Sequence, residues 1–125
     1  MKSLNPDIIV NATGSEPTLP PIRGLHELVD KEDSHVATVL KMIERIPEYP
    51  EHMEGRKVVI IGGGAVGLDV MEFFTERGAR VSMVEMLPMI GNGLDPVSRC
   101  DIHAKLKKYQ VEQMVNTMLQ EVRND

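Results

Sequence analysis

The sequence predicts an α/β protein with a Rossmann-like, doubly wound parallel sheet. An apolar run, a glycine cluster, an amphipathic segment and a second apolar run follow one another over residues 57–85. This order is typical of a strand, a turn, a helix and a strand. A further helical pattern and a third short apolar run then continue the alternation. We therefore expect three layers, with helices on both faces of the sheet.

The first element expected is a short buried strand at residues 7–12. These residues read Asp-Ile-Ile-Val-Asn-Ala, an apolar run that Thr13 and Gly14 end. Residues 15–24 then contain three prolines and a glycine. Because proline fixes φ and removes an amide donor, we expect an extended linker there, with a boundary near residue 25.

Residues 26–56 should contain one helix and a connector. The helix is expected to start at Asp33 or Ser34, either of which can cap it, and to run to about Ile46. Apolar residues recur there at three- and four-residue intervals and form one stripe. Pro47 ends the pattern, and the residues up to 56 are polar and rich in proline.

Residues 57–125 should form the core of the fold. In order, we expect a strand at 57–61, a turn at 62–67, a helix at 66–77, a strand at 80–85, a helix from about 96 to 109, a strand at 111–115 and a weak strand at 117–122. In the first helix the side chains expected to face the sheet are Val66, Val70, Phe73 and Phe74. Gly78 should end that helix, and Pro96 should begin the next one.

The turn carries the clearest functional motif. It consists of Gly62, Gly63, Gly64, Ala65, Val66 and Gly67. The spacing G-x-G-x-x-G is weak alone, but here it follows a strand, opens a helix and lies in a unit of about 30 residues that ends in an acid. Gly62 allows the sharp turn, Gly64 lets a pyrophosphate approach the backbone, and Gly67 lets the helix pack closely.

The start of that helix would bind the phosphates through free amides and the helix dipole. The competing interpretation is a glycine-rich turn that serves packing alone. No Lys-Ser or Lys-Thr pair follows the glycines, so the turn is not a P-loop.

Glu85 closes the second strand of this unit. A carboxylate there can accept hydrogen bonds from both hydroxyls of an adenosine ribose, and it would repel a 2′-phosphate. Met86 and Leu87 follow it, where an NADP-binding site would favour arginine. The sequence therefore favours NAD(H) over NADP(H), although the glycine spacing alone does not separate NAD from FAD.

Composition excludes several other functions. The formal net charge is −5 and no basic block occurs, so nucleic acid and anionic membranes are poor partners. There is no signal-peptide core and no apolar run of bilayer length, so we expect a cytoplasmic protein or domain. The four histidines lack metal-site spacing, and Cys100 is the only cysteine and is taken as an inert thiol. No metal site and no catalytic residue are predicted.

Two segments resemble a known family. Residues 7–15, followed by Pro17, Pro20-Pro21-Ile22 and Gly24, resemble the Ala-Thr-Gly segment of two-dinucleotide flavoprotein reductases. Residues 60–68 resemble the glycine fingerprint of the NAD(P) domain in that family. The residues of these two segments are most similar to those of the enoate reductase and 2,4-dienoyl-CoA reductase branch of the NADH:flavin oxidoreductases, which are related to old yellow enzyme.

The resemblance implies a long parent protein. A flavin-bearing barrel with an iron–sulfur cluster would precede FAD- and NAD(P)-binding domains, and residues 1–25 would come from the end of an FAD-domain half. It also implies that Glu85 faces NADH and that Gly14 lies near FAD. Asp69 occupies a position where the family often has glutamate, which the resemblance implies lies near the nicotinamide end of the bound nucleotide.

The resemblance further implies a truncated domain, since the chain stops at Asp125, before the family's last strand. The edge beside residues 57–61 would then be vacant. We expect residues 7–12 to fill it, or to pair with a second copy of the chain and give a homodimer.

The leading hypothesis is a module that positions NADH for hydride transfer to FAD. The isolated chain would bind NADH without catalysing a reaction, and its partners would be the FAD-binding and barrel domains of the parent. Two alternatives stay open. One is a stand-alone Rossmann-like domain that senses NAD(H) or serves as an assembly surface, and the other is an FAD-binding domain.

Overall fold

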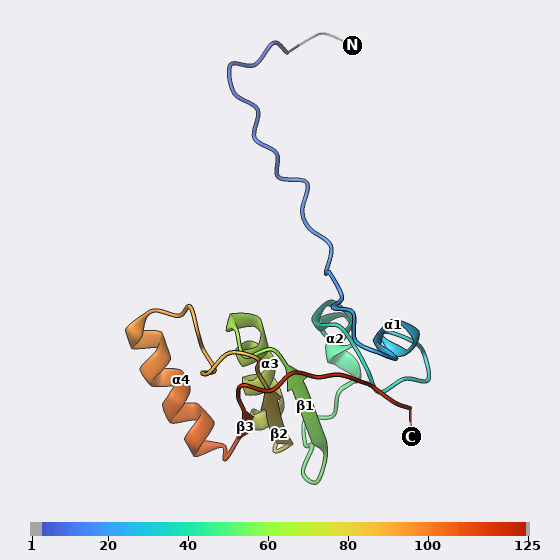
Figure 1. Ribbon diagram of the computed structural model, residues 1–125, viewed down its shortest axis with the longest axis vertical. Coiled ribbons are helices and arrows are strands. Elements are labelled where there is room, and N and C mark those ends of the chain that lie inside the picture. Colours follow the sequence, from blue (N-terminus) through green and yellow to red (C-terminus); the bar gives the residue numbers. More distant parts are fainter. Residues whose placement is uncertain (1–3, 125) are drawn as a thin grey trace.

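The computed structural model describes residues 4–124, and a parallel sheet lies at its centre (Figure 1). Its strands are β1 (Lys57–Ile61), β2 (Arg80–Val84) and β3 (Glu112–Met114), in the order β1-β2-β3. The last residues of the three strands are neighbours in the register, so all three strands end at the same edge of the sheet. The parallel α/β class predicted from the sequence is confirmed.

Two helices connect the strands. α3 (Ala65–Glu76) joins β1 to β2, and α4 (Pro96–Lys108) joins β2 to β3. The chain leaves α3 through Gly78, whose φ of 84° is left-handed. α4 is capped by Asp95, whose carboxylate accepts hydrogen bonds from the amides of Val97 and Ser98 at 2.9 and 3.1 Å. These local signals explain why both helices begin and end within about a residue of the prediction.

The core lies between the sheet and these helices. It contains Ile60, Val81 and Met83 from the strands and Leu68, Met71 and Leu106 from the helices. Side chains alternate along a strand, so Val59 and Ile61 point to the other face, where they are 60% and 49% exposed. Residues 4–124 therefore form two of the three expected layers.

The buried stripe of α3 differs from the predicted one. Its buried residues are Leu68, Met71, Phe74 and Thr75. Val66 is 57% exposed, so its expected place against the sheet is wrong. Val66 lies in the first turn of α3, whereas Phe73 and Phe74 lie near its other end, where Tyr49 makes edge-on contacts with them at ring-centroid distances of 5.9 and 5.4 Å.

Short helices precede the sheet. They are α1 (Leu25–Leu28), α2 (Val39–Glu44) and the 3₁₀ helix η1 (Ile46–Glu48). The predicted start of α2 at Asp33 or Ser34 is wrong, because Thr38 is the cap and its hydroxyl accepts from the Lys41 amide at 3.2 Å. Asp30 fixes that cap by accepting from the Thr38 amide at 2.7 Å, a contact that helical periodicity does not reveal.

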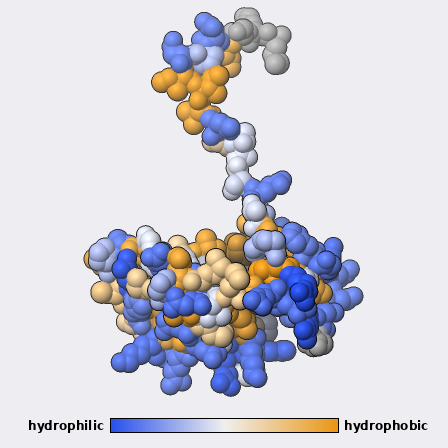
Figure 2. Space-filling model, in the orientation of Figure 1, coloured by the Kyte–Doolittle hydropathy of each residue, from blue (hydrophilic) through white to orange (hydrophobic). Residues whose placement is uncertain are grey.

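The expected strand at residues 7–12 is not present. This segment is extended and runs away from the rest of the chain (Figure 1), and its apolar side chains face solvent (Figure 2). Ile8, Ile9 and Val10 are 82%, 81% and 83% exposed. The expected pairing beside β1 within the same chain is therefore wrong. An apolar run forms a strand only where a sheet edge meets it, and the proline-rich linker leads this run away from β1.

The weak strand expected at residues 117–122 is reduced to one bridge. Arg23 and Glu121 form an isolated parallel bridge, and the Val122 amide donates to the Arg23 carbonyl at 2.9 Å. The C-terminal segment thus crosses from β3 to the start of α1 (Figure 1). None of the helices within residues 4–124 has both the length and the apolar character that a membrane span needs.

Candidate functional site

The glycine turn lies where β1 ends. Gly62 has a φ of 107°, a conformation that favours glycine, and its amide donates to the Val84 carbonyl at 2.9 Å. A Cβ placed on Gly67 would overlap the Gly62 carbonyl oxygen. The first and last glycines of the motif are thus required by the backbone itself, because the turn is sharp and α3 packs directly against it.

Gly64 differs from both, because the space beside it is open. No protein atom lies within 4 Å of the Cβ it would carry. Gly64 is also the N-cap of α3 and has no side chain to occupy the amides of the first helical turn. A helix start with free amides and open space in front of it is suited to an anion such as a phosphate.

Gly63 is held on both sides. Its N–H donates to Glu85 Oε2 at 2.6 Å, and its carbonyl accepts from the Gly91 amide at 2.7 Å. A Cβ on Gly63 would lie 3.1 Å from Ile90 Cγ1 and 3.2 Å from Glu85 Oε2. The turn is therefore fixed by the loop after β2, not only by its own glycines.

Glu85 sits one residue beyond β2, with its carboxylate beside the turn. Besides the Gly63 amide it accepts from the Leu87 amide, at 2.8 Å. These backbone hydrogen bonds, the one from Leu87 first, hold the pKa of Glu85 below its usual range despite partial burial. Glu85 is therefore ionised at neutral pH. Two bonds leave part of its acceptor capacity free for a ligand.

The loop that follows β2 packs against the turn. Ile90 is 1% exposed and belongs to the hydrophobic core, although it lies between Pro88 and Gly91 in a segment without regular structure. The sequence analysis gave Ile90 no role. The only signal was a single isoleucine between Pro88 and Gly91, which periodicity does not detect.

The structure brings most of the predicted site residues to one edge. The glycine turn and Glu85 touch, and Ala65 and Val66 open α3 beside them with exposed side chains. Met86 is 64% exposed, and Asp69 lies exposed one turn further along α3. Gly14 is not part of this cluster, because it lies in the extended N-terminal segment with no atom within 4 Å of the Cβ it would carry.

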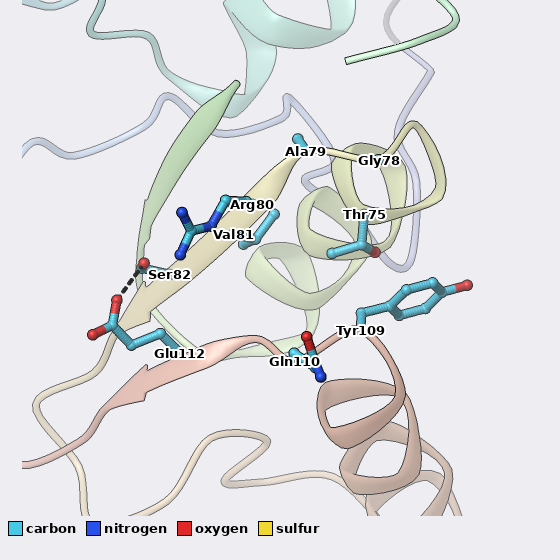
Figure 3. Close-up of a pocket in the computed structure, with 9 residues that line it drawn as sticks. All are labelled: Thr75, Gly78, Ala79, Arg80, Val81, Ser82, Tyr109, Gln110 and Glu112. Atoms are coloured by element: carbon cyan, nitrogen blue, oxygen red, sulfur yellow. Dashed lines mark hydrogen bonds between the residues drawn. The ribbon is translucent and has the colours of Figure 1, made fainter. Parts of the chain in front are cut away.

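A separate pocket opens at the other end of the sheet (Figure 3). It has a volume of about 570 Å³ and is lined by Thr75, Gly78, Ala79, Arg80, Val81, Ser82, Tyr109, Gln110 and Glu112. Inside it the Ser82 hydroxyl donates to Glu112 Oε2 at 2.7 Å. Because it lies at the amino ends of β2 and β3, it has no part in the cluster around Glu85. Within residues 4–124, no group of three or more acidic, His or Cys side chains is placed to hold a metal ion.

The chain matches known proteins over nearly its whole length. The sequence model of a family described as pyridine nucleotide-disulphide oxidoreductase matches residues 2–125. The NADH oxidase of Thermoanaerobacter brockii is 32% identical over 120 residues, which cover 96% of this chain and 17% of that protein. The CoA-dependent NAD(P)H sulfur oxidoreductase of Pyrococcus abyssi is 34% identical over 122 residues, which cover 97% of this chain and 25% of that protein.

A solved structure shares the fold. The 2-naphthoyl-CoA reductase in complex with 2-naphthoyl-CoA aligns with a TM-score of 0.71 at 24% identity, over 91% of this chain and 16% of that one. The chain thus spans only 16% to 25% of the length of these three proteins.

Proposed function

Because the chain belongs to the pyridine nucleotide-disulphide oxidoreductase family, we propose that it is the NADH-binding module of a flavin-dependent oxidoreductase. The observation that carries this proposal is the contact between Glu85 and the glycine turn. This contact supports the proposal, because an ionised carboxylate that could accept hydrogen bonds from a ribose lies beside a helix start with free amides and open space. Together these are the two halves of an adenosine diphosphate site.

Each residue has a defined task in this proposal. The first-turn amides of α3 bind the pyrophosphate, which approaches over Gly64. Glu85 accepts hydrogen bonds from the ribose hydroxyls, and its charge opposes a 2′-phosphate. Met86 and Leu87 present apolar surface next to that carboxylate, being 64% and 45% exposed. Asp69 lies further along α3, toward the nicotinamide end.

The chemistry of the parent enzyme comes from its flavin. FAD bound by the parent would supply the hydride acceptor, and the residues of this chain would bind and orient the nucleotide. The isolated chain therefore binds NADH and turns over no substrate. The segment around Gly14 would belong to the FAD-binding part of the parent, which fits its lack of contacts with the sheet.

The proposal extends to a long parent enzyme. About 120 residues make up 17% of the Thermoanaerobacter brockii protein but 25% of the Pyrococcus abyssi protein, so the first is considerably longer. A long parent is what the enoate reductase and dienoyl-CoA reductase branch, with its additional barrel domain, requires. Reduction of an enoate or a dienoyl-CoA by the full-length parent with NADH would support this branch, and activity with polysulfide alone would contradict it.

The binding proposal is tested by closing the space beside Gly64. The Gly64→Val variant places a branched side chain where the phosphates would lie, so NADH binding should fall below detection. Fluorescence titration of NADH into the purified chain measures this. Ala104→Val, on the exposed surface of α4, is the matched control and should bind like the wild type. Unchanged NADH binding by a folded Gly64→Val chain would refute the proposed site.

A further inference from the structure

Gly63 occupies a variable position of the glycine motif, where the spacing G-x-G-x-x-G does not demand glycine. Its backbone φ is not in the left-handed range, so conformation alone does not require glycine either. The space around it, however, is tight for a side chain. A Cβ would meet Ile90 Cγ1 at 3.1 Å, Glu85 Oε2 at 3.2 Å and Ile90 Cα at 3.3 Å, all tighter than ordinary van der Waals contact.

Ile90 and Gly91 form a wall beside Gly63, and neither residue can easily move away from it. Ile90 is 1% exposed and packs within the core. The next residue, Gly91, is buried and is tied to the turn through the hydrogen bond from its amide to the Gly63 carbonyl. A methyl group added at Gly63 would therefore displace the less buried neighbour, which is the carboxylate of Glu85.

We propose that Gly63 and the Ile90–Gly91 wall set the position of the Glu85 carboxylate and thereby determine the preference for NADH over NADPH. This inference rests on the proposed function. Gly63 acts in two ways: its N–H donates to Glu85 Oε2 at 2.6 Å, and its missing side chain leaves room for that oxygen. Gly63 is a positioning residue that acts on the nucleotide through Glu85, and the Ile90–Gly91 wall acts through Gly63, which it borders and holds by a hydrogen bond.

The proposal predicts a change in the ratio of the affinity for NADH to the affinity for NADPH. The carboxylate favours NADH through hydrogen bonds to the ribose, and it disfavours NADPH because two negative charges come close together. Moving the carboxylate weakens both effects. Affinity for NADH then falls while affinity for NADPH falls less or rises. A change at Gly64 differs, because the phosphates that approach it are common to both nucleotides.

The test compares Gly63→Ala with Gly64→Ala. Both variants and the wild type are titrated with NADH and with NADPH, and folding is checked by circular dichroism. In Gly63→Ala the NADH/NADPH affinity ratio should fall about tenfold, the effect of one charge-assisted hydrogen bond. In Gly64→Ala both affinities should fall and the ratio should hold.

The outcomes separate this inference from the proposed function. A wild-type chain that binds neither nucleotide overturns both. A wild-type chain that prefers NADH, with an unchanged ratio in a folded Gly63→Ala variant, overturns the inference alone. If Gly63→Ala does not fold, Ile90→Val decides, since it removes one methyl group from the wall. The ratio should then fall by at least about twofold, and an unchanged ratio overturns the inference.

Discussion

Among single residues, Glu85 contributes both to the stability of the fold and to the proposed nucleotide binding. Its carboxylate is held by the amides of Leu87 and Gly63, and the pKa of Glu85 is lowered as a result. A lowered folded-state pKa means that ionised Glu85 stabilises the fold. This contribution is present above the usual pKa range of glutamate and is lost as the pH falls through the lowered value.

The pH dependence of unfolding tests this contribution. Glu85→Gln should lower the free energy of unfolding at pH 7 by about 1 kcal/mol, because charge-assisted hydrogen bonds to two amides are weakened. The difference from the wild type should shrink as the pH falls below the lowered pKa, where Glu85 itself is protonated. Urea unfolding at pH 7 and at a series of decreasing acidic pH values measures both quantities. A gap that keeps the same size until the protein unfolds in acid would contradict this role.

Among the secondary-structure elements, aromatic contacts pack the segment containing α2 and η1 against α3. Tyr49 follows η1 and packs edge-on against Phe73 and Phe74 of α3. The Met53 amide also donates to the Arg77 carbonyl at 2.6 Å, just after α3. The segment containing α2 and η1 thus packs against α3, and Met42 of α2 is buried in the same core cluster as Met71 of α3.

Removing the Tyr49 ring should destabilise α2 more than the strands β1 and β2. Tyr49→Ala should cost about 2–3 kcal/mol, from two aromatic pairs and lost apolar burial. Hydrogen exchange should quicken most at the amides of α2, and the amides of β1 and β2 should change less. Tyr49→Phe, which keeps the ring, is the control. Equal loss of protection across α2 and the strands would show that the two parts unfold together.

The elements differ in how well the sequence predicts them. β1, α3, β2 and α4 follow from local signals: a β-branched run, glycines, Gly78 after a helix and Asp95 before Pro96. The cap of α2 and the burial of Ile90 depend on contacts between distant residues, which periodicity does not carry. The same holds for Gly63, where Ile90 and Glu85, each more than 20 positions away in sequence, limit the room for a side chain.

At the scale of the whole molecule, two surfaces lack a partner within residues 4–124. One is the outer edge of β1, beside which no strand is paired within residues 4–124. The other is the extended segment 7–12 (Figure 2). Pairing of this segment with β1 of a second copy would cover both, and we propose this as the form in which the isolated chain would dimerise.

The association state tests that proposal. A triple variant with Ile8, Ile9 and Val10 changed to serine should be monomeric in sedimentation, while the wild type should dimerise. The free energy of unfolding of the monomer should stay within about 0.5 kcal/mol, because these side chains are 81–83% exposed. A wild-type chain that remains monomeric at high concentration would contradict the pairing.

Calorimetric titration of the purified wild-type chain with NADH and with NADPH tests whether this chain is an NADH-binding module. We predict one NADH bound per chain, with NADPH binding at least about tenfold more weakly because of the charge on Glu85. Absence of heat with NADH, or equal affinity for the two nucleotides, would contradict the account.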